Sequence, residues 1–175
     1  MNLPPLPAHA HAQPLLPAQG AVELLFLLFH GAGAHAGQMD GLAQALRAQY
    51  PQAAIVALDA PLRLPAEAID GFQWFDETDQ GPDARSAGVA AALPGFVATV
   101  RQWAEAFALD WPRVALGGFS QGGLMALEAV QANGSGPMLV NSSRAILYAG
   151  RSLADFAQQA RAVALATRDQ LQAAR

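Results

Sequence analysis

The segment 118–122 reads Gly-Phe-Ser-Gln-Gly, and it has the form of a turn that carries a nucleophilic serine. A serine hydroxyl is a weak nucleophile, so acyl-transfer enzymes place it where a base can reach it and where hydrogen-bond donors await the developing oxyanion. In the strand–turn–helix form of Gly-x-Ser-x-Gly, the glycines avoid collisions with the flanking strand and helix. The spacing therefore predicts Ser120 as a nucleophile, between the turn glycines Gly118 and Gly122.

The same five residues have a simpler interpretation, in which a glycine-rich turn only carries a serine that caps a helix. The surrounding pattern favours the catalytic one. Residues 114–118 read as a short apolar strand, and residues 121–133 read as a helix that Gly134 ends. This is the context that a nucleophile turn requires.

A second glycine turn follows the apolar run 22–29, where residues 30–33 read His-Gly-Ala-Gly. Such a turn brings one backbone N–H close to the nucleophile, and the residue after the nucleophile supplies another. We therefore expect Ala32 and Gln121 to donate to an oxyanion. Taken alone the turn is a weak signal, because any tight strand-to-helix connection needs glycines for steric reasons.

The elements that position these turns alternate between strand and helix. Residues 22–29 and 53–58 are almost continuously apolar, which is typical of strands buried on both faces of a parallel sheet. Helical spacing predicts helices over 39–50 and 89–107, and Pro94 indicates a kink or a late start in the latter. Beyond residue 144 the pattern weakens and suggests a strand over 145–148, a helix over 153–160, a strand over 162–166 and a helical stub over 168–175.

The order of these elements predicts the α/β class, with a mostly parallel sheet, helices on both faces and an incomplete C-terminal part. We expect residues 1–20, rich in proline and alanine, to form a disordered lead-in that is not a secretory signal, and residues 21–175 to form a partial domain. An incomplete sheet leaves a strand edge bare, so self-association is expected as well.

Composition excludes several classes of function. The chain has 175 residues, a formal net charge of -4 and no cysteine, and its basic residues do not cluster, so nucleic acid is not an expected partner. The longest apolar stretch is too short to cross a bilayer. We expect a cytoplasmic protein without a membrane span, a cofactor or a metal.

Three stretches together resemble the phospholipase/carboxylesterase family, which includes acyl-protein thioesterases and bacterial esterases. They are Leu-Phe-His-Gly-Ala-Gly at 28–33, Gln-Trp-Phe-Asp at 73–76, and Gly-Phe-Ser-Gln-Gly at 118–122, and the likeness spans roughly residues 24–151. The resemblance implies an α/β-hydrolase fold and a serine esterase or thioesterase that forms an acyl-enzyme on Ser120, with Ala32 and Gln121 as oxyanion donors.

The chain departs from that family after the nucleophile. Family members carry an aspartate in a His-Gly-x-x-Asp turn and then a Gly-His turn, and this sequence has neither. All four histidines, His9, His11, His30 and His35, precede Ser120, whereas the hydrolase order is nucleophile, acid, histidine. We therefore expect a truncated or frame-shifted tail and an impaired enzyme, with Asp169 as a candidate for a decayed acid position.

The histidines near the first turn have two interpretations each. His30 ends a buried strand, where an imidazole braces the turn, and His35 lies close enough in sequence to serve as a substitute base. The aromatic residues Phe72, Trp74 and Phe75 are expected to line an apolar slot for small ester or thioester substrates with short acyl groups.

Two alternatives remain open. A non-catalytic module could keep the hydrolase pocket and bind an acyl chain without cleaving it, which the absence of a C-terminal histidine favours. The run Gly-Ala-Gly-Ala-His-Ala-Gly at 31–37, followed by Asp59 after the next strand, imitates a dinucleotide fingerprint, but its third glycine comes one residue late.

Overall fold

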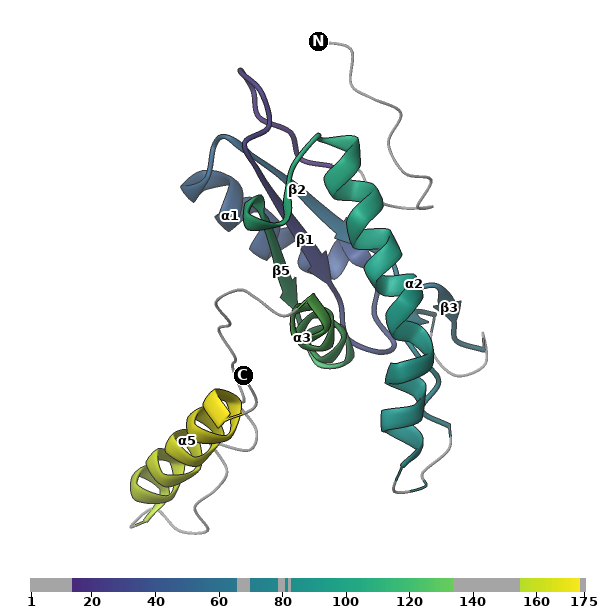
Figure 1. The fold of residues 1–175 in the computed structure, drawn as a ribbon, viewed down its shortest axis with the longest axis vertical. Helices are drawn as coiled ribbons and strands as arrows, with labels where there is room; N and C mark the ends of the chain where they lie inside the picture. Colours follow the sequence, from purple (N-terminus) through teal and green to yellow (C-terminus); the bar gives the residue numbers. More distant parts are fainter. Residues whose placement is uncertain (1–13, 66–69, 79–80, 82, 134–154, 174–175) are drawn as a thin grey trace. The chain divides into compact units, whose positions relative to one another are not determined.

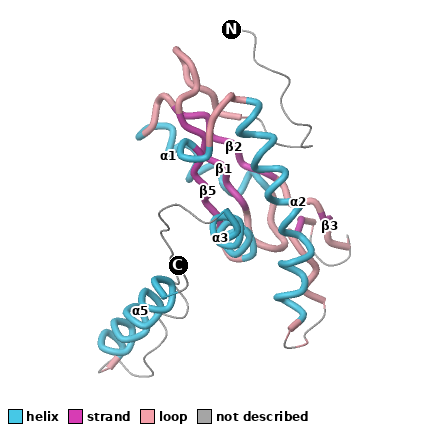
Figure 2. Tube along the Cα trace, viewed as in Figure 1, coloured by secondary structure: helices cyan, strands magenta, loops and turns pink. Residues whose placement is uncertain are grey.

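The computed structural model describes residues 14–65, 70–78, 81, 83–133 and 155–173. The chain forms two compact units, Met1–Ala132 and Asn133–Arg175. Figures 1 and 2 show the main helices and strands. Up to residue 133 the elements are, in chain order, β1 (Leu24–Phe29), η1 (Ala36–Met39), α1 (Asp40–Gln49), β2 (Ala53–Leu58), β3 (Leu62–Arg63), β4 (Phe72–Gln73), α2 (Ala84–Ala106), η2 (Trp111–Arg113), β5 (Val114–Gly118) and α3 (Gln121–Asn133).

The main sheet confirms the predicted α/β class. Its described strands lie in the order β2-β1-β5, and both neighbours run parallel to β1. The register pairs Phe29, the last residue of β1, with Gly118, the last residue of β5. Because parallel strands end at the same edge of a sheet, the turn after β1 and the turn after β5 lie next to each other.

Helices cover both faces of this sheet, as the sequence predicts. Leu25, Leu27 and Phe29 of β1 belong to one apolar cluster, together with residues of α2 and α3. Leu28 belongs to a second cluster with η1, α1 and β2. Figure 1 shows α2 and α3 on one side of the sheet and α1 on the other. The alternation of β1 side chains between two hydrophobic layers explains why the whole strand is apolar.

Helix α2 differs from its prediction at one end. It starts at Ala84 rather than near residue 89, and it continues through Pro94. Proline removes one backbone hydrogen bond and crowds the preceding turn, but Pro94 lies on the exposed side of the helix. The buried side, with Phe96, Val100 and Trp103 packed in the core, keeps the helix in place.

The second unit contains α5 (Phe156–Ala173), which is one continuous helix. The predicted strand over 162–166 is therefore wrong. Alanine is the strongest helix former, and an alanine-rich run placed between two helical segments joins them into one helix. The predicted strand over 145–148 lies outside the described residues.

The two edges of the sheet differ within the described chain. At the β2 edge, Leu15 forms an antiparallel bridge with Ile55, in which N–H···O distances are 2.9 and 3.0 Å. At the β5 edge, none of the described strands pairs with β5 on the side away from β1.

No helix in the described segments has both the length and the apolar character that a bilayer crossing requires.

Candidate active site

Ser120 lies on a strained turn between β5 and α3. Its φ is 52°, a left-handed conformation that residues with a side chain rarely adopt. The side chain is exposed, and no described residue hydrogen-bonds to its hydroxyl. The strain results from the turn that reverses the chain directly from strand to helix, which projects the serine from the end of the sheet.

The two turn glycines allow backbone segments to touch. A Cβ at Gly118 would lie 2.4 Å from the carbonyl carbon of Gly122. A Cβ at Gly122 would lie 2.5 Å from the carbonyl oxygens of both Phe29 and His30. These distances exclude any side chain, so the glycines predicted at these positions are sterically required.

The turn after β1 lies against Ser120. A Cβ at Gly31 would be 3.3 Å from the Ser120 Cβ, and Gly33 has a φ of 76° that favours glycine. The backbone N–H of Phe119 also donates to the carbonyl oxygen of Phe29, at 3.0 Å. The structure thus brings the two predicted glycine turns together.

The two expected oxyanion donors have backbone N–H groups with no hydrogen-bond partner among the described residues. Their neighbours are occupied: Gly33 N–H donates to the Phe72 carbonyl at 2.9 Å, and Gly122 N–H donates to the Phe119 carbonyl at 3.0 Å. Gln121 is also the first residue of α3, where helix N–H groups point outward and favour negative charge. Ala32 and Gln121 therefore keep the donors that an oxyanion would need.

His30 occupies a structural position. It is 1% exposed, its Nδ1 lies 2.7 Å from the Gly31 carbonyl oxygen, and its Nε2 accepts a hydrogen bond from the Ala60 N–H at 3.0 Å. This pattern requires the tautomer with the proton on Nδ1. Burial lowers the pKa of the imidazole, which keeps it neutral. Both ring nitrogens are engaged, so His30 braces the turn and has no free nitrogen for a base.

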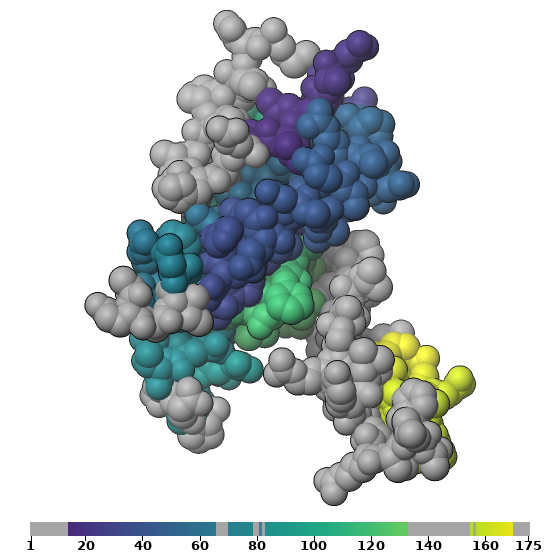
Figure 3. Space-filling view, turned by 180° about the vertical axis from the view of Figure 1, so that it is seen from behind, coloured from purple at the N-terminus to yellow at the C-terminus, as the bar shows by residue number. Residues whose placement is uncertain are grey.

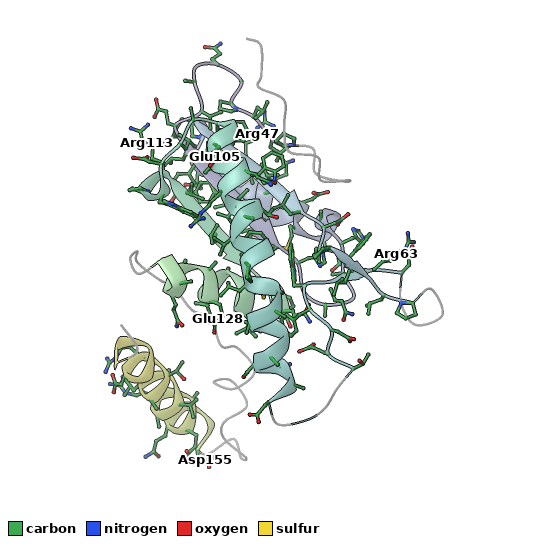
Figure 4. The ribbon with its side chains drawn as sticks, turned by 45° about the vertical axis from the view of Figure 1, so that its right-hand side comes forward. Arg47, Arg63, Glu105, Arg113, Glu128 and Asp155 are labelled. Carbon is green, nitrogen blue, oxygen red and sulfur yellow. The ribbon has the colours of Figure 1, made fainter. Side chains whose placement is uncertain are left out.

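His35 lies in a different hollow from the Ser120 turn. It lines a hollow of about 380 Å³ together with Asp59, Arg63, Asp70 and others, and none of the described residues in that lining belongs to the segment 118–122. Figure 4 shows Arg63 directed away from the sheet, and its ion pair with Asp70 is largely exposed. Among the described residues, no interaction joins His35 to Ser120.

The aromatic segment 72–75 belongs to the core. Trp74 is 5% exposed and Phe75 is 2% exposed, and Trp74 packs edge-on against Phe29 and Phe96. Buried rings cannot line a slot that is open to substrate, so the expectation for Trp74 and Phe75 is wrong. In the sequence, aromatic residues flank the polar Gln73. This pattern does not distinguish a segment that rims a pocket from one that fills the interior.

A hollow of about 290 Å³ adjoins both glycine turns instead. It is lined by His30, Gly31, Gln38, Met39, Leu42, Gly118 and Phe119. Its apolar walls come from η1 and α1 on one side and from Phe119 on the other, and Phe119 is 70% exposed. On the face seen in Figure 3, the blue surface of the η1 and α1 region lies beside the green surface around the start of α3.

The side chain of Gln121 was not foreseen as a functional group. It is 4% exposed, its Oε1 accepts from the Trp74 N–H at 2.6 Å, and its Nε2 donates to the Phe75 carbonyl at 2.8 Å. The only sequence signal for this role is the residue type, because a glutamine after Ser120 provides a side-chain amide that can both donate and accept a hydrogen bond.

The candidate acid, Asp169, lies in α5. Its side chain is 60% exposed and pairs with Arg168 at 2.6 Å. Asp169 belongs to the unit Asn133–Arg175, whereas Ser120 belongs to Met1–Ala132. Within the described segments, no group of three or more His, Cys, Asp or Glu side chains is arranged to hold a metal ion.

Comparison with known proteins gives a consistent family. Residues 13–142 match the family model described as Phospholipase/Carboxylesterase. The chain is 36% identical to the esterase YpfH of Escherichia coli (strain K12) over 145 residues, which cover 82% of this chain and 58% of that protein. The crystal structure of esterase PE8 superposes with a TM-score of 0.60 at 31% identity, covering 67% of this chain and 55% of PE8. The chain thus spans little more than half the length of these esterases.

Orotidine 5'-phosphate decarboxylases also match part of the chain. The orotidine 5'-phosphate decarboxylase of Albidiferax ferrireducens is 77% identical over 39 residues, which cover 22% of this chain and 13% of the decarboxylase. The orotidine 5'-phosphate decarboxylase of Leptothrix cholodnii is 49% identical over 89 residues, which cover 49% of this chain and 31% of that protein.

Proposed function

Because the chain belongs to the phospholipase/carboxylesterase family, we propose that it carries the nucleophile half of a serine carboxylic-ester or thioester hydrolase, with Ser120 as the acyl-accepting residue. The observation that carries this proposal is the left-handed φ of 52° at Ser120, held between β5 and α3 against the Gly31 turn. The strained backbone at Ser120 costs free energy of folding, and a serine that only caps a helix would not need this strain. The family assignment leaves the dinucleotide alternative without support.

Attack by the Ser120 hydroxyl on an ester carbonyl would form a tetrahedral intermediate, whose oxyanion would receive hydrogen bonds from the N–H groups of Ala32 and Gln121. Collapse of this intermediate would release the alcohol or thiol and leave the acyl group on the serine. Water would then release the acid. Both steps need a base that takes the serine or water proton and returns it to the leaving group.

The hollow beside the turns supports a small acyl group. Its volume of about 290 Å³ is at the lower end of the range for small-molecule sites. Met39, Leu42 and Phe119 provide apolar walls, and no arginine or lysine lines the hollow. We therefore assign short acyl esters or thioesters as substrates, rather than lipids with an anionic head group.

None of the described residues provides this base. No histidine follows Ser120 in the sequence, His30 is occupied by two hydrogen bonds, and His35 lines another hollow. Residues of a triad act as a unit, so the loss of one costs about as much as the loss of all. The 175-residue chain is accordingly an impaired hydrolase in this proposal.

The segment shared with the decarboxylase offers a reason for this. The decarboxylase of Leptothrix cholodnii matches over 89 residues, about twice the length of the unit Asn133–Arg175, and the match to the esterase family ends at residue 142. We infer that the decarboxylase-like part includes this unit, which then takes the place of the hydrolase part that carries the triad aspartate and histidine. Aligning residues 133–175 alone with the decarboxylase tests this, and a match confined to residues before 133 would contradict it.

A second candidate function is binding of an acyl chain without cleavage, which is favoured because no described residue forms a hydrogen bond with the Ser120 hydroxyl. A fluorophosphonate probe distinguishes the two. Rapid labelling that Ser120→Ala abolishes means that a base is in place, whereas fatty-acid binding without labelling means a pocket alone.

The proposed function is tested by restoring what is missing. A family-like C-terminal segment that carries the Asp and His turns is joined after Arg151, and hydrolysis of an activated aryl ester is measured. We expect a gain of several orders of magnitude that Ser120→Ala removes. A folded graft with no gain would contradict the assignment of Ser120.

A further inference from the structure

The segment from Phe72 to Phe75 connects the two glycine turns of the site. It is bonded on one side to the turn after β1 and on the other side to the first residue of α3. Resting on the proposed function of Ala32 and Gln121 as oxyanion donors, we propose that the side chains of Trp74 and Gln121 are positioning residues, which hold these two donors in a fixed relation.

The bonds to the first turn surround Ala32. The Trp74 Nε1–H donates to the His30 carbonyl at 2.8 Å. The Gly33 N–H donates to the Phe72 carbonyl, and the Phe72 N–H donates to the Ala34 carbonyl, both at 2.9 Å. Ala32 itself is exposed and makes no hydrogen bond with a described residue through its N–H, so its position depends on these anchored neighbours.

The turn needs such external support because of its composition. Ala32 lies between two glycines, which lose more conformational freedom on ordering than other residues. Gly71 packs so tightly that a Cβ there would lie 2.4 Å from the Gly33 carbonyl oxygen. The segment before Phe72 therefore also presses directly on the backbone of the donor turn.

The bonds to the second donor come from one side chain. The Gln121 amide bridges the Trp74 N–H and the Phe75 carbonyl, at 2.6 and 2.8 Å, and it is buried. The same residue presents its backbone N–H at the start of α3. Trp74 is thus bonded to Gln121 through its backbone and to the first turn through its indole, so one residue joins the supports of both donors.

Burial makes these bonds effective. Trp74, Gln121 and His30 are each at most 5% exposed, so water cannot replace a lost partner easily. Removing one partner of a buried hydrogen bond leaves the other unsatisfied. Because water does not take the place of the lost partner, we expect the segment 72–75 and the turns bonded to it to become more mobile.

The chain provides a matched control for this proposal. Trp103 is also buried, at 1% exposure, but its Nε1 has no hydrogen-bond partner in the described structure. Trp74→Phe removes an indole together with its bond to the His30 carbonyl. Trp103→Phe removes an indole and packing volume without a hydrogen bond to the site.

The test is ¹⁵N relaxation of the Ala32 amide, a measurement that needs no hydrolysis and is therefore independent of the proposed activity. In the natural chain we expect an order parameter of about 0.85, and in Trp74→Phe and Gln121→Met we expect it to fall below about 0.6. In Trp103→Phe it should remain unchanged. An Ala32 amide that stays rigid in the first two variants, or loosens equally in Trp103→Phe, overturns the proposal.

A second variant keeps the test decisive if Gln121→Met does not fold. Gln121→Glu retains an oxygen that accepts from the Trp74 N–H, but only its protonated form can donate to the Phe75 carbonyl. We expect the Ala32 amide to be rigid at a pH where the carboxyl is protonated and to loosen as it ionises. A pH-independent order parameter in this variant contradicts the role of the Gln121 side chain.

Discussion

A Cβ on Gly122 would lie 2.5 Å from the carbonyl oxygen of His30. This close approach is the point where the turn that carries Ser120 meets the glycine turn after β1, and it brings the first residues of α3 against the end of β1. The same His30 carbonyl accepts the indole N–H of Trp74 at 2.8 Å. One peptide group thus contacts all three segments of the site.

The first prediction concerns this contact. Gly122→Ala should lower the free energy of unfolding by about 3 kcal/mol, because the new methyl group must displace the backbone of Phe29 and His30. Gly95→Ala is the matched control, since no heavy atom outside its own helix lies within 4 Å of the added Cβ. It should raise stability by about 0.5–1 kcal/mol. Urea denaturation followed by tryptophan fluorescence measures both, and equal effects would contradict the contact.

The second prediction concerns the pH dependence of stability. Burial lowers the pKa of His30 from its ordinary value of 6.5. Below pH 6.5 the unfolded chain takes up a proton at this residue and the folded chain does not, so the free energy of unfolding should fall as the pH falls. The slope contributed by one proton is at most about 1.4 kcal/mol per pH unit.

The control for this effect is His30→Asn, which keeps a short hydrogen-bonding side chain that does not titrate. The variant should be less stable at neutral pH. Between the pKa of His30 in the folded chain and 6.5, the pH dependence of the free energy of unfolding that His30 causes should disappear. A slope that is identical in the variant and the natural chain would show that His30 does not cause it.

The third prediction concerns association. The side of β5 away from β1 has no partner strand among the described elements, and Ala115 and Gly118 in it are exposed. An unpaired strand edge favours pairing with another chain, so we expect self-association or poor solubility. Ala115→Lys should reduce it by placing a charge on the edge strand. Sedimentation equilibrium tests both, and a monodisperse monomer with a cooperative melt at high temperature would count against the bare edge.

The fourth prediction concerns selectivity. Aryl esters of short acids should be hydrolysed faster than anionic phospholipids, because the hollow has apolar walls and its described lining contains no arginine or lysine. Competition between the two substrate classes measures the ratio of kcat/KM in the grafted protein. A strong preference for the anionic lipid would contradict the assignment of the hollow as the acyl site.

The sequence was sufficient for the parts of the fold whose periodicity is strong. Strands 24–29, 53–58 and 114–118 follow the apolar runs, and the steric need for Gly118 and Gly122 follows from the motif. The segment 162–166 was misassigned because five residues cannot distinguish a short strand from a piece of a longer helix.

The orientation of side chains was less predictable. Phe72, Trp74 and Phe75 look alike in sequence, yet Trp74 and Phe75 lie inside the core, where Trp74 packs against Phe29 and Phe96. For the same reason the bridge made by the Gln121 amide to residues 46 and 47 positions away could not be inferred from local pattern. Contacts at such separation depend on how the whole sheet folds.

The central claim of the proposed function is that Ser120 is a nucleophile with Ala32 and Gln121 as oxyanion donors, and that no described residue serves as its base. It is tested most directly by the rate at which the natural chain, Ser120→Ala and His35→Ala hydrolyse an activated aryl ester. Without its base a serine hydrolase loses about 10⁶-fold, and the oxyanion hole and binding alone retain roughly 10³- to 10⁴-fold over water. We predict a rate barely above background that changes little in either variant. A large drop in Ser120→Ala would show that a base is already in place, and a matching drop in His35→Ala would identify that base as His35 and contradict the account.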